Sequence, residues 1–321
     1  MDSIPVIDIR AKGAAGRVCR AVQEVGFLII SGHGVSAETI AATRAAAWDF
    51  FALPQPAKEA IFQREGGLNR GYTPFESEFN GSTYTEKAPP DLREGFIYGP
   101  FDLPNDRYYN SPEAGFAYQD NIWPAGRQDI AEALRDYYRA LEGLNRKLLE
   151  LFAEALSLAP GFFQDKFDRH ASTVRLLHYP AQSALPVEGQ LRCGAHTDFG
   201  SHTIILADNA PGGLQVRLHD GSWIDVVPPP DSFIVNIGDL MMTWTNDLWL
   251  SNLHRVAVPP PDSGPRLSIA FFCHPNYDAL IQCIETCRRL GEAPHHQPVR
   301  AGDYRKLQVK KITADAQRKS D

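Results

Sequence analysis

The sequence has no long apolar run, no CxxC pair of cysteines and no secretory leader pattern. Uninterrupted apolar stretches such as residues 27–30 are far too short to cross a bilayer, so we expect no transmembrane helix and no membrane partner. The first residues, MDSIPVIDIR, contain neither a basic segment nor a long apolar segment, which argues against secretion. The five cysteines form no CxxC pair, which favours a reduced, cytoplasmic protein over a disulfide scaffold.

Charge and motif content exclude further classes of protein. Thirty-two basic against 39 acidic residues give a formal net charge of −7, which argues against a nucleic-acid partner. The sequence contains no GxSxG motif, no HExxH motif and no phosphate-binding loop, which disfavours the hydrolases and nucleotide-binding enzymes that depend on them. With 321 residues, 43% of them hydrophobic and 22% charged, the chain has the composition of one large globular domain or two.

The first half of the chain mixes helical and strand patterns. Residues 27–30 are typical of a buried strand closed by the turn Ser31-Gly32-His33-Gly34, and Ser36 can cap the alanine-rich helix that follows. Apolar residues recur at helical spacing across residues 128–158, which predicts a long amphipathic helix. We therefore expect a mixed α/β region over residues 1–110 and a long helical support over residues 111–170.

After Pro160 short strand-like runs alternate with turns. These runs are residues 174–179, 191–196, 203–207, 214–218, 223–227, 233–237, 241–244, 253–258 and 267–273. Closely spaced strands without intervening helices favour a double-sheet jelly roll and disfavour a doubly wound sheet. The expected fold is therefore α+β, with a jelly-roll core (a double-stranded β-helix) over residues 171–275, flanking helices and a helical tail over residues 276–321.

A candidate metal site combines His196-Thr197-Asp198 with a distant histidine. Alternate residues of a strand share a face, so His196 and Asp198 can present a nitrogen and a carboxylate oxygen to one point. His254 follows later in the chain, and strands that far apart in sequence can be neighbours in a jelly roll. Two histidines and one carboxylate on one face of a metal leave the opposite face open, as in the non-haem Fe(II) oxygenases.

Other histidines and another metal compete with this interpretation. An HxD motif alone is weak evidence, and His202 lies close to it in sequence. The doublet His295-His296 lies in a proline-rich polar segment that we expect at the surface. A zinc hydrolase would also accept two imidazoles and a carboxylate as ligands.

Arginine, serine and tyrosine side chains form a second constellation. Arg266 and Ser268 open the run RLSIAFFCH and share a strand face, where a guanidinium with a hydroxyl beside it can bind a carboxylate bidentately. Tyr179, at the end of VRLLHYP, could donate a third hydrogen bond to the same carboxylate. The alternatives are an ion pair of Arg266 at the rim of the barrel and a tyrosine that is simply buried.

The order HTD, LHRV and PRLS resembles the isopenicillin N synthase-like branch of the Fe(II)/2-oxoglutarate-dependent oxygenases. IPVIDI, VGFLIISGHGV, RGYTPFESE and LREGFIYG resemble the amino-terminal region of that branch, and WIDVVPPPDSFIVNIGDLMMTWTND resembles its central barrel. The resemblance implies that iron is held by His196, Asp198 and His254. It also implies that the distal carboxylate of 2-oxoglutarate is held by Arg266 and Ser268, with help from Tyr179.

The resemblance further implies a reaction and its cofactors. Fe(II), 2-oxoglutarate and O2 would together hydroxylate or desaturate a small to mid-sized organic substrate, with release of succinate and CO2. Plant members commonly carry Asn two residues before the tyrosine, where this chain has Leu177. In isopenicillin N synthase the Arg-x-Ser pair serves the substrate, so an oxidase that uses no 2-oxoglutarate is an alternative. A non-catalytic or zinc-binding jelly-roll protein is a second alternative.

Strand alternation also suggests substrate contacts. Phe272 and His274 share the strand face of the arginine–serine pair and would lie deeper along the same wall. On a neighbouring strand, Arg175 shares a face with the candidate tyrosine and could meet an anionic group. Arg70 and Tyr72 could line the mouth of the site. For each of these residues, a role in the core or at the surface is the competing interpretation.

Overall fold

Two facing sheets form the centre of the computed structural model, which describes residues 3–62, 69–83, 88–181, 186–208, 210 and 212–317. The larger sheet has eight strands in the order β1-β2-β10-β7-β12-β5-β4-β3, and the smaller has four in the order β6-β11-β8-β9. The strands of the larger sheet are β1 (Val6–Asp8), β2 (Phe27–Ser31), β3 (Gly71–Thr73), β4 (Glu94–Tyr98), β5 (Thr173–Tyr179), β7 (His202–Ala207), β10 (Phe233–Ile237) and β12 (Arg266–Cys273). Those of the smaller are β6 (Cys193–His196), β8 (Leu214–Arg217), β9 (Trp223–Asp225) and β11 (His254–Val256).

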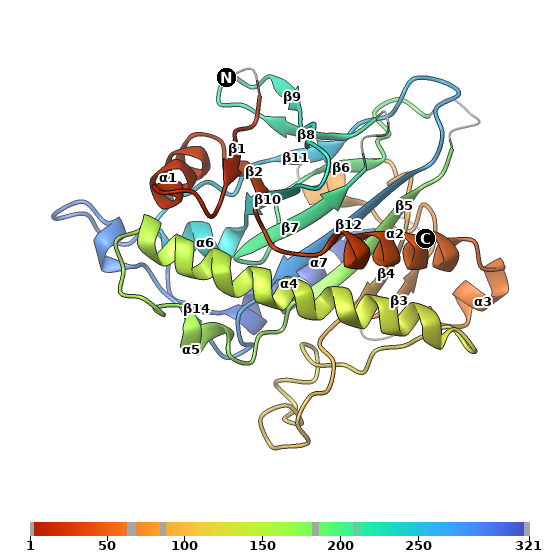
Figure 1. Ribbon diagram of the computed structural model, residues 1–321, viewed down its shortest axis with the longest axis horizontal. Helices are drawn as coiled ribbons and strands as arrows, with labels where there is room; N and C mark the ends of the chain where they lie inside the picture. The colour runs from red at the N-terminus through yellow and green to blue at the C-terminus, as the bar shows by residue number, and fades with distance from the viewer. Residues whose placement is uncertain are drawn as a thin grey trace.

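Helices cover the outer face of the larger sheet (Figure 1). They are α1 (Ala14–Glu24), α2 (Ala37–Phe51) and the long α4 (Gln128–Ala155), whose apolar residues join those of the strands in one core. In α4 the buried positions, such as Ile130, Leu134 and Leu141, recur every three or four residues and so face the sheet. The expected cap of α2 is present, because the backbone N–H of Thr39 donates to Ser36 Oγ over 3.0 Å.

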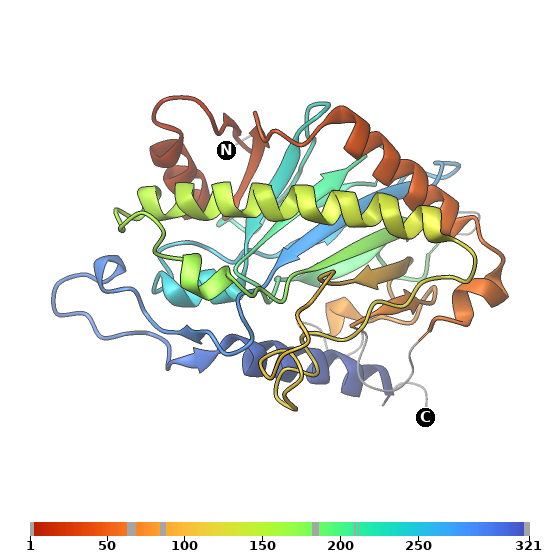
Figure 2. The same ribbon diagram turned by 60° about the horizontal axis from the view of Figure 1, so that its bottom comes forward.

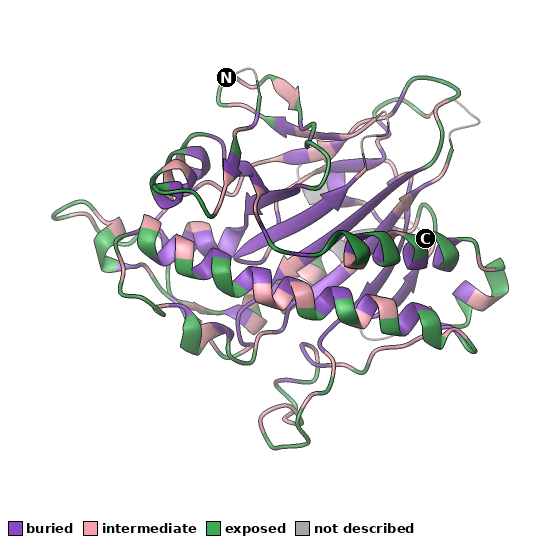
Figure 3. Cartoon of the chain, in the orientation of Figure 1, coloured by how far each residue is buried: buried purple, intermediate pink, exposed green. Residues whose placement is uncertain are grey.

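The inner face of the larger sheet looks toward the smaller sheet, and strand pairing brings the candidate site residues to it. The central strands β7 and β10 are buried at every residue, since helices cover one face and the smaller sheet the other (Figure 3). β12 lies between β5 and β7, with Arg266 opposite Tyr179 and Ala270 opposite Arg175. In the smaller sheet β11 runs antiparallel to β6 and places His254 opposite His196.

The α+β fold with a double-stranded β-helix core is confirmed, but one expected strand is wrong. Residues 241–244 lie in the helix α6 (Asp239–Trp244). Its start is fixed by the backbone N–H groups of Asp239 and Leu240, which donate to the carbonyls of Asp198 and Gly200. A short apolar run does not reveal by its pattern alone whether it is strand or helix, and here tertiary hydrogen bonds decide.

The last part of the chain is helical over a shorter range than expected. The strands β13 (Leu280–Ile281) and β14 (Val299–Arg300), with the 3₁₀ turn η2 (Glu285–Cys287) between them, precede the helix α7 (Ala301–Gln317). Three short elements complete the described structure: α3 (Gln55–Glu59), η1 (Asn80–Thr83) and α5 (Gln164–Phe167). The division of the chain into four regions stays a prediction. Across the described ranges, each helix is too short or too polar to traverse a bilayer.

Candidate metal centre and adjoining cavities

Three side chains from β6, the turn after it and β11 converge on one point. The Nε2 atoms of His196 and His254 lie 3.8 Å and 3.7 Å from Oδ1 of Asp198. One ligand atom of each residue lies within 4.8 Å of the others, and the described residues contain no second cluster of this kind. This spacing suits a single cation bound by two nitrogens and one carboxylate oxygen.

Backbone carbonyls fix the tautomer of both histidines. His196 Nδ1 donates to the carbonyl of Gly194 over 2.8 Å, and His254 Nδ1 donates to that of Asn252 over 3.1 Å. Each Nε2 therefore turns its lone pair toward the cluster, as a metal ligand requires. Burial, followed by the neighbouring His254, lowers the pKa of His196 to about 3, so this imidazole is neutral at physiological pH.

Two hydrogen bonds hold the carboxylate of Asp198. Its Oδ2 accepts from Thr203 Oγ1 over 2.5 Å and from Asn236 Nδ2 over 2.7 Å, which leaves Oδ1 facing the histidines. Burial acts to raise the pKa of Asp198, but His254, His196 and these two donors hold that pKa below its ordinary value. Asp198 is therefore an ionised ligand whose orientation is set before a metal binds.

We expect removal of these two donors to loosen the site without removing a ligand. The double variant T203V/N236L should raise the dissociation constant for Fe(II), measured without oxygen by chelator competition, about 10- to 100-fold, because partners of this type orient the ligand carboxylate. T43V is the matched control, since the buried hydroxyl of Thr43 bonds only within α2, to the carbonyl of Thr39. Unchanged affinity in the double variant would show that the donors do not orient Asp198.

The competing histidines lie elsewhere. His202 is fully buried in β7, where its Nδ1 bonds to Ser201 Oγ over 2.8 Å and its ring packs edge-on against Phe152. His295 and His296 lie near the surface and both bond to the carboxylate of Asp247, over 2.7 Å and 2.6 Å. None of the three approaches the cluster, so the HxD motif and His254 form the candidate metal centre.

One cavity runs from the three candidate ligands to Arg266, Ser268 and Tyr179. The guanidinium of Arg266 lies over the Tyr179 ring, 5.2 Å from its centroid, and its Nε is 3.4 Å from Asp208 Oδ1. Within the described structure, the buried Nε and Nη1 of Arg266 have no hydrogen-bond partner. Buried donors are costly to leave unpaired, so this end of the cavity suits the carboxylate of a ligand.

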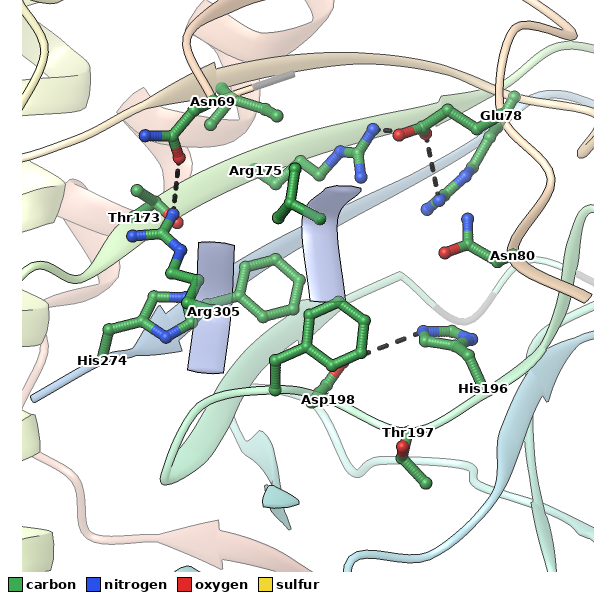
Figure 4. A pocket seen from close by; sticks show the side chains of 15 residues that line it. Asn69, Glu78, Asn80, Thr173, Arg175, His196, Thr197, Asp198, His274 and Arg305 are labelled. Carbon is green, nitrogen blue, oxygen red and sulfur yellow. Dashed lines mark hydrogen bonds and ion pairs between the residues drawn. The ribbon is translucent and has the colours of Figure 1, made fainter. Parts of the chain in front are cut away.

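A second cavity, of about 140 Å³, is also lined by His196 and Asp198 and is seen from close by in Figure 4. Three of the expected substrate residues, Phe272, His274 and Arg175, line it. Phe272 is half-buried and lines both cavities, so it stands between the carboxylate-binding end and the larger space. Strand alternation in β12 thus predicted which side chains face inward.

Arg70 and Tyr72 do not line this cavity, in contrast to the expectation from the sequence. Tyr72 is 1% exposed, and its hydroxyl donates to Glu94 Oε2 over 2.7 Å. Arg70 is 2% exposed, and its three nitrogens donate to the backbone carbonyls of Gln119, Asn69 and Ala117. Tyr72 belongs to β3, which pairs with β4 at the edge of the larger sheet, and Arg70 precedes that strand, so the described contacts give both side chains a structural role.

A buried ionic cluster beside the metal centre was not expected from the sequence. Glu78 forms ion pairs with Arg175 and, over 3.1 Å, with Arg93, whose Nε is 3.4 Å from Asp91. Asn80 donates to the other side of the cluster, at Asp91 Oδ2, over 2.6 Å. Two carboxylates therefore balance two guanidinium groups, and Arg175 reaches the cavity with its charge already paired. Glu78 and Asn80 come from a stretch without periodicity, so only the tertiary fold reveals this cluster.

Comparison with known proteins finds two family models of dioxygenases that match different parts of the chain. The family model described as the 2OG-Fe(II) oxygenase superfamily matches residues 171–275. The model described as the non-haem dioxygenase in morphine synthesis N-terminal region matches residues 4–126. The first match contains both sheet segments that carry the candidate ligands, as well as all of β12.

Individual relatives extend over most of the chain. The 2-oxoglutarate-Fe(II) type oxidoreductase hxnY of Emericella nidulans is 34% identical over 282 residues, which cover 87% of this chain and 78% of the relative. Homoarginine-6-hydroxylase 2-ODD-233 of Oryza sativa subsp. japonica is 32% identical and covers 88% and 84%. A full-length Neurospora crassa protein, whose crystal structure contains alpha-KG and thymine, has a TM-score of 0.82 at 27% identity, covering 97% and 96%.

Proposed function

Because the chain belongs to the 2OG-Fe(II) oxygenase superfamily and is an Fe(II)/2-oxoglutarate-dependent dioxygenase, we propose that His196, Asp198 and His254 bind its iron for the hydroxylation of a small organic molecule. The observation that carries this proposal is the convergence of the three ligand atoms on a point from which two cavities open. One cavity suits the cosubstrate and the other the substrate. Hydroxylation, rather than desaturation, is favoured by relatives that are named as hydroxylases.

We assign Arg266, Ser268 and Tyr179 to the distal carboxylate of 2-oxoglutarate. The support is the buried Nη1 of Arg266, which has no hydrogen-bond partner in the described structure, and the position of Tyr179 directly across the strand pair from Arg266. A carboxylate there would accept charge-assisted hydrogen bonds in a site shielded from water, where such bonds are strong. Use of the oxoacid, over the alternative of an oxidase that needs none, is favoured by relatives that are named as 2-oxoglutarate-Fe(II) type oxidoreductases.

Bound iron supplies the activation of O2, at the expense of 2-oxoglutarate, which is split into succinate and CO2. The protein supplies orientation and charge. The neutral imidazole of His196 and the ionised carboxylate of Asp198 bind a cation without first releasing a proton. Phe272, which lines both cavities, positions the apolar part of a substrate beside the cosubstrate and excludes water between them.

The cavity, the net charge and the cysteines of the chain support a proposal for its partners and its cellular location. A small-molecule substrate is favoured by the small size of the cavity, about 140 Å³, and by solved relatives that bind thymine or 5-formyluracil. The acidic net charge of −7 argues against a nucleic-acid partner. The free cysteines of the chain are in keeping with a cytoplasmic location.

Two coupled measurements test this function. Anaerobic addition of Fe(II) and then 2-oxoglutarate should produce a weak visible charge-transfer band, and candidate substrates should stimulate succinate formation. Oxygen uptake that is independent of 2-oxoglutarate would instead identify the oxidase alternative. Absence of the band and of succinate with every substrate would favour a zinc-binding or inactive protein.

A further inference from the structure

We propose that Arg305 binds a carboxylate of the substrate, so that the enzyme acts on an organic acid with an apolar body. This inference rests on the proposed function, because it names the class of substrate for the same cavity. Arg305 projects from α7 into the wall of that cavity, among residues that come from five other parts of the chain, within residues 69–80, 93–97, 173–175, 196–199 and 272–274. It is 7% exposed, so its guanidinium is shielded from bulk water.

The hydrogen-bond partners of Arg305 are uncharged. Its Nη2 donates to Asn69 Oδ1 over 2.6 Å and its Nη1 to the carbonyl of Ala171 over 3.1 Å. Its guanidinium carbon lies 5.6 Å from the ring centroid of Phe116, in the loop that lies beside α7 in Figure 2. These contacts orient the side chain and leave its positive charge uncompensated by any carboxylate of the described residues within ion-pair distance.

A second buried guanidinium adds to this excess of positive charge. Burial, and then the nearby Arg70, lower the pKa of Arg305 to about 9, a value at which the group is still protonated at neutral pH. Burial likewise lowers the pKa of Arg70 to about 10. A buried charge is costly unless it is paired, and a bound anion would lift that cost. Arg70 is enclosed by backbone carbonyls, so Arg305 is the member of this pair that a ligand in the cavity can reach.

The other charged groups of the cavity wall do not require an anion. Glu78 neutralises Arg175 and, with Asp91, also Arg93. Figure 4 shows Arg305 together with Asn69, Thr173 and His274 at one end of the cavity, and Glu78 and Asn80 at the other. The uncompensated charge is therefore confined to one end.

This placement orients the substrate. Apolar side chains, which include Ile97, Phe199, Phe272 and Val309, line the same cavity and suit an aliphatic or aromatic body. In Figure 4, His196 lies on the side of the cavity away from Arg305. A carboxylate held by Arg305 would therefore leave the remote end of the molecule beside the metal centre, and oxidation is expected at a carbon distant from the carboxylate.

Calorimetric titration with matched acids and amides tests this assignment. The probes are phenylacetate, 3-phenylpropanoate and 4-phenylbutanoate, each against its neutral amide. The buffer contains Mn(II) and excess 2-oxoglutarate and no oxygen, so that the Arg266 end is already filled. For the wild type we expect at least one acid to bind about 10-fold or more tightly than its amide, since a buried charge-assisted pair is gained. R305Q should abolish that preference, and R305K should retain part of it.

Two further variants make the result specific. K306Q removes the same charge from the exposed neighbouring position of α7 and should keep the wild-type preference. R255Q should keep it as well, because Arg255 points away from the cavity, with its guanidinium carbon 4.1 Å from the Trp223 ring centroid. The proposal is overturned if no acid of the series binds, if acid and amide bind the wild type equally, or if R305Q prefers the acid as the wild type does. Succinate formation tests the proposed function separately, because these titrations need no turnover.

Discussion

Replacement of Asp198 by Ala should lower substrate-dependent succinate formation by on the order of a thousandfold or more. The variant loses the one anionic ligand of the triad, and a metal ion that is lost or misplaced forfeits several kcal/mol of stabilisation of the reaction. H196A and H254A should have effects of the same order, since each removes a nitrogen whose lone pair is aimed at the cluster. Initial rates at saturating 2-oxoglutarate, together with Fe(II) binding measured by chelator competition, give both quantities.

H296A is the matched control for the histidine variants. It removes an imidazole near the surface that bonds to Asp247, far from the cavities, and should leave the rate and the metal affinity unchanged. Before their rates are compared, all variants should be shown by their thermal stability to be folded. A triad variant that retained wild-type succinate formation would contradict the assignment of its ligand.

Replacement of Arg266 by Ala should raise the 2-oxoglutarate concentration needed for half-maximal rate about a hundredfold. The change removes one partner of a buried, charge-assisted pair, which costs about 2–5 kcal/mol, and every 1.4 kcal/mol is about tenfold in affinity. The maximal rate should change far less, because Arg266 lies at the end of the cavity and not among the metal ligands. Titration of the anaerobic charge-transfer band with 2-oxoglutarate measures the affinity directly.

R255A controls for the general loss of an arginine from these sheets. Arg255 follows His254 on β11 but points away from the cavity, with its guanidinium carbon 4.1 Å from the Trp223 ring centroid and its Nε bonded to Gln215. Its loss should leave the affinity for 2-oxoglutarate unchanged. Wild-type affinity in R266A would remove Arg266 from the cosubstrate site.

The site residues that lie on strands could be predicted from the sequence. Alternation along a strand places Arg266, Ser268 and Phe272 on one face whatever the loops do, and the structure has them so. The position of Tyr179 then depends only on the register between β12 and its partner strand β5, which places Tyr179 directly opposite Arg266. To bring the HxD motif and the distant histidine together, just one strand pairing was required, that of β6 with β11.

Loops and the carboxyl-terminal helix could not be placed in the same way. Glu78 meets Arg175 across almost a hundred residues, and no local pattern marks a loop glutamate as the partner of a strand arginine. Arg305 reaches the cavity only because α7 packs beside the segment that contains Asn69. Arg70 and Tyr72 failed as mouth residues for the converse reason, since Tyr72 is buried in the edge strand β3 and Arg70 bonds to backbone carbonyls of Asn69, Ala117 and Gln119.

The most direct test of the account is a crystal structure of the protein with Mn(II) and 2-oxoglutarate, with the metal located by its anomalous scattering. We expect a single strong peak coordinated by Nε2 of His196, Oδ1 of Asp198 and Nε2 of His254, with the distal carboxylate of the oxoacid on Arg266. A metal bound elsewhere, a fourth protein ligand that closes the centre, or 2-oxoglutarate away from Arg266 would contradict it.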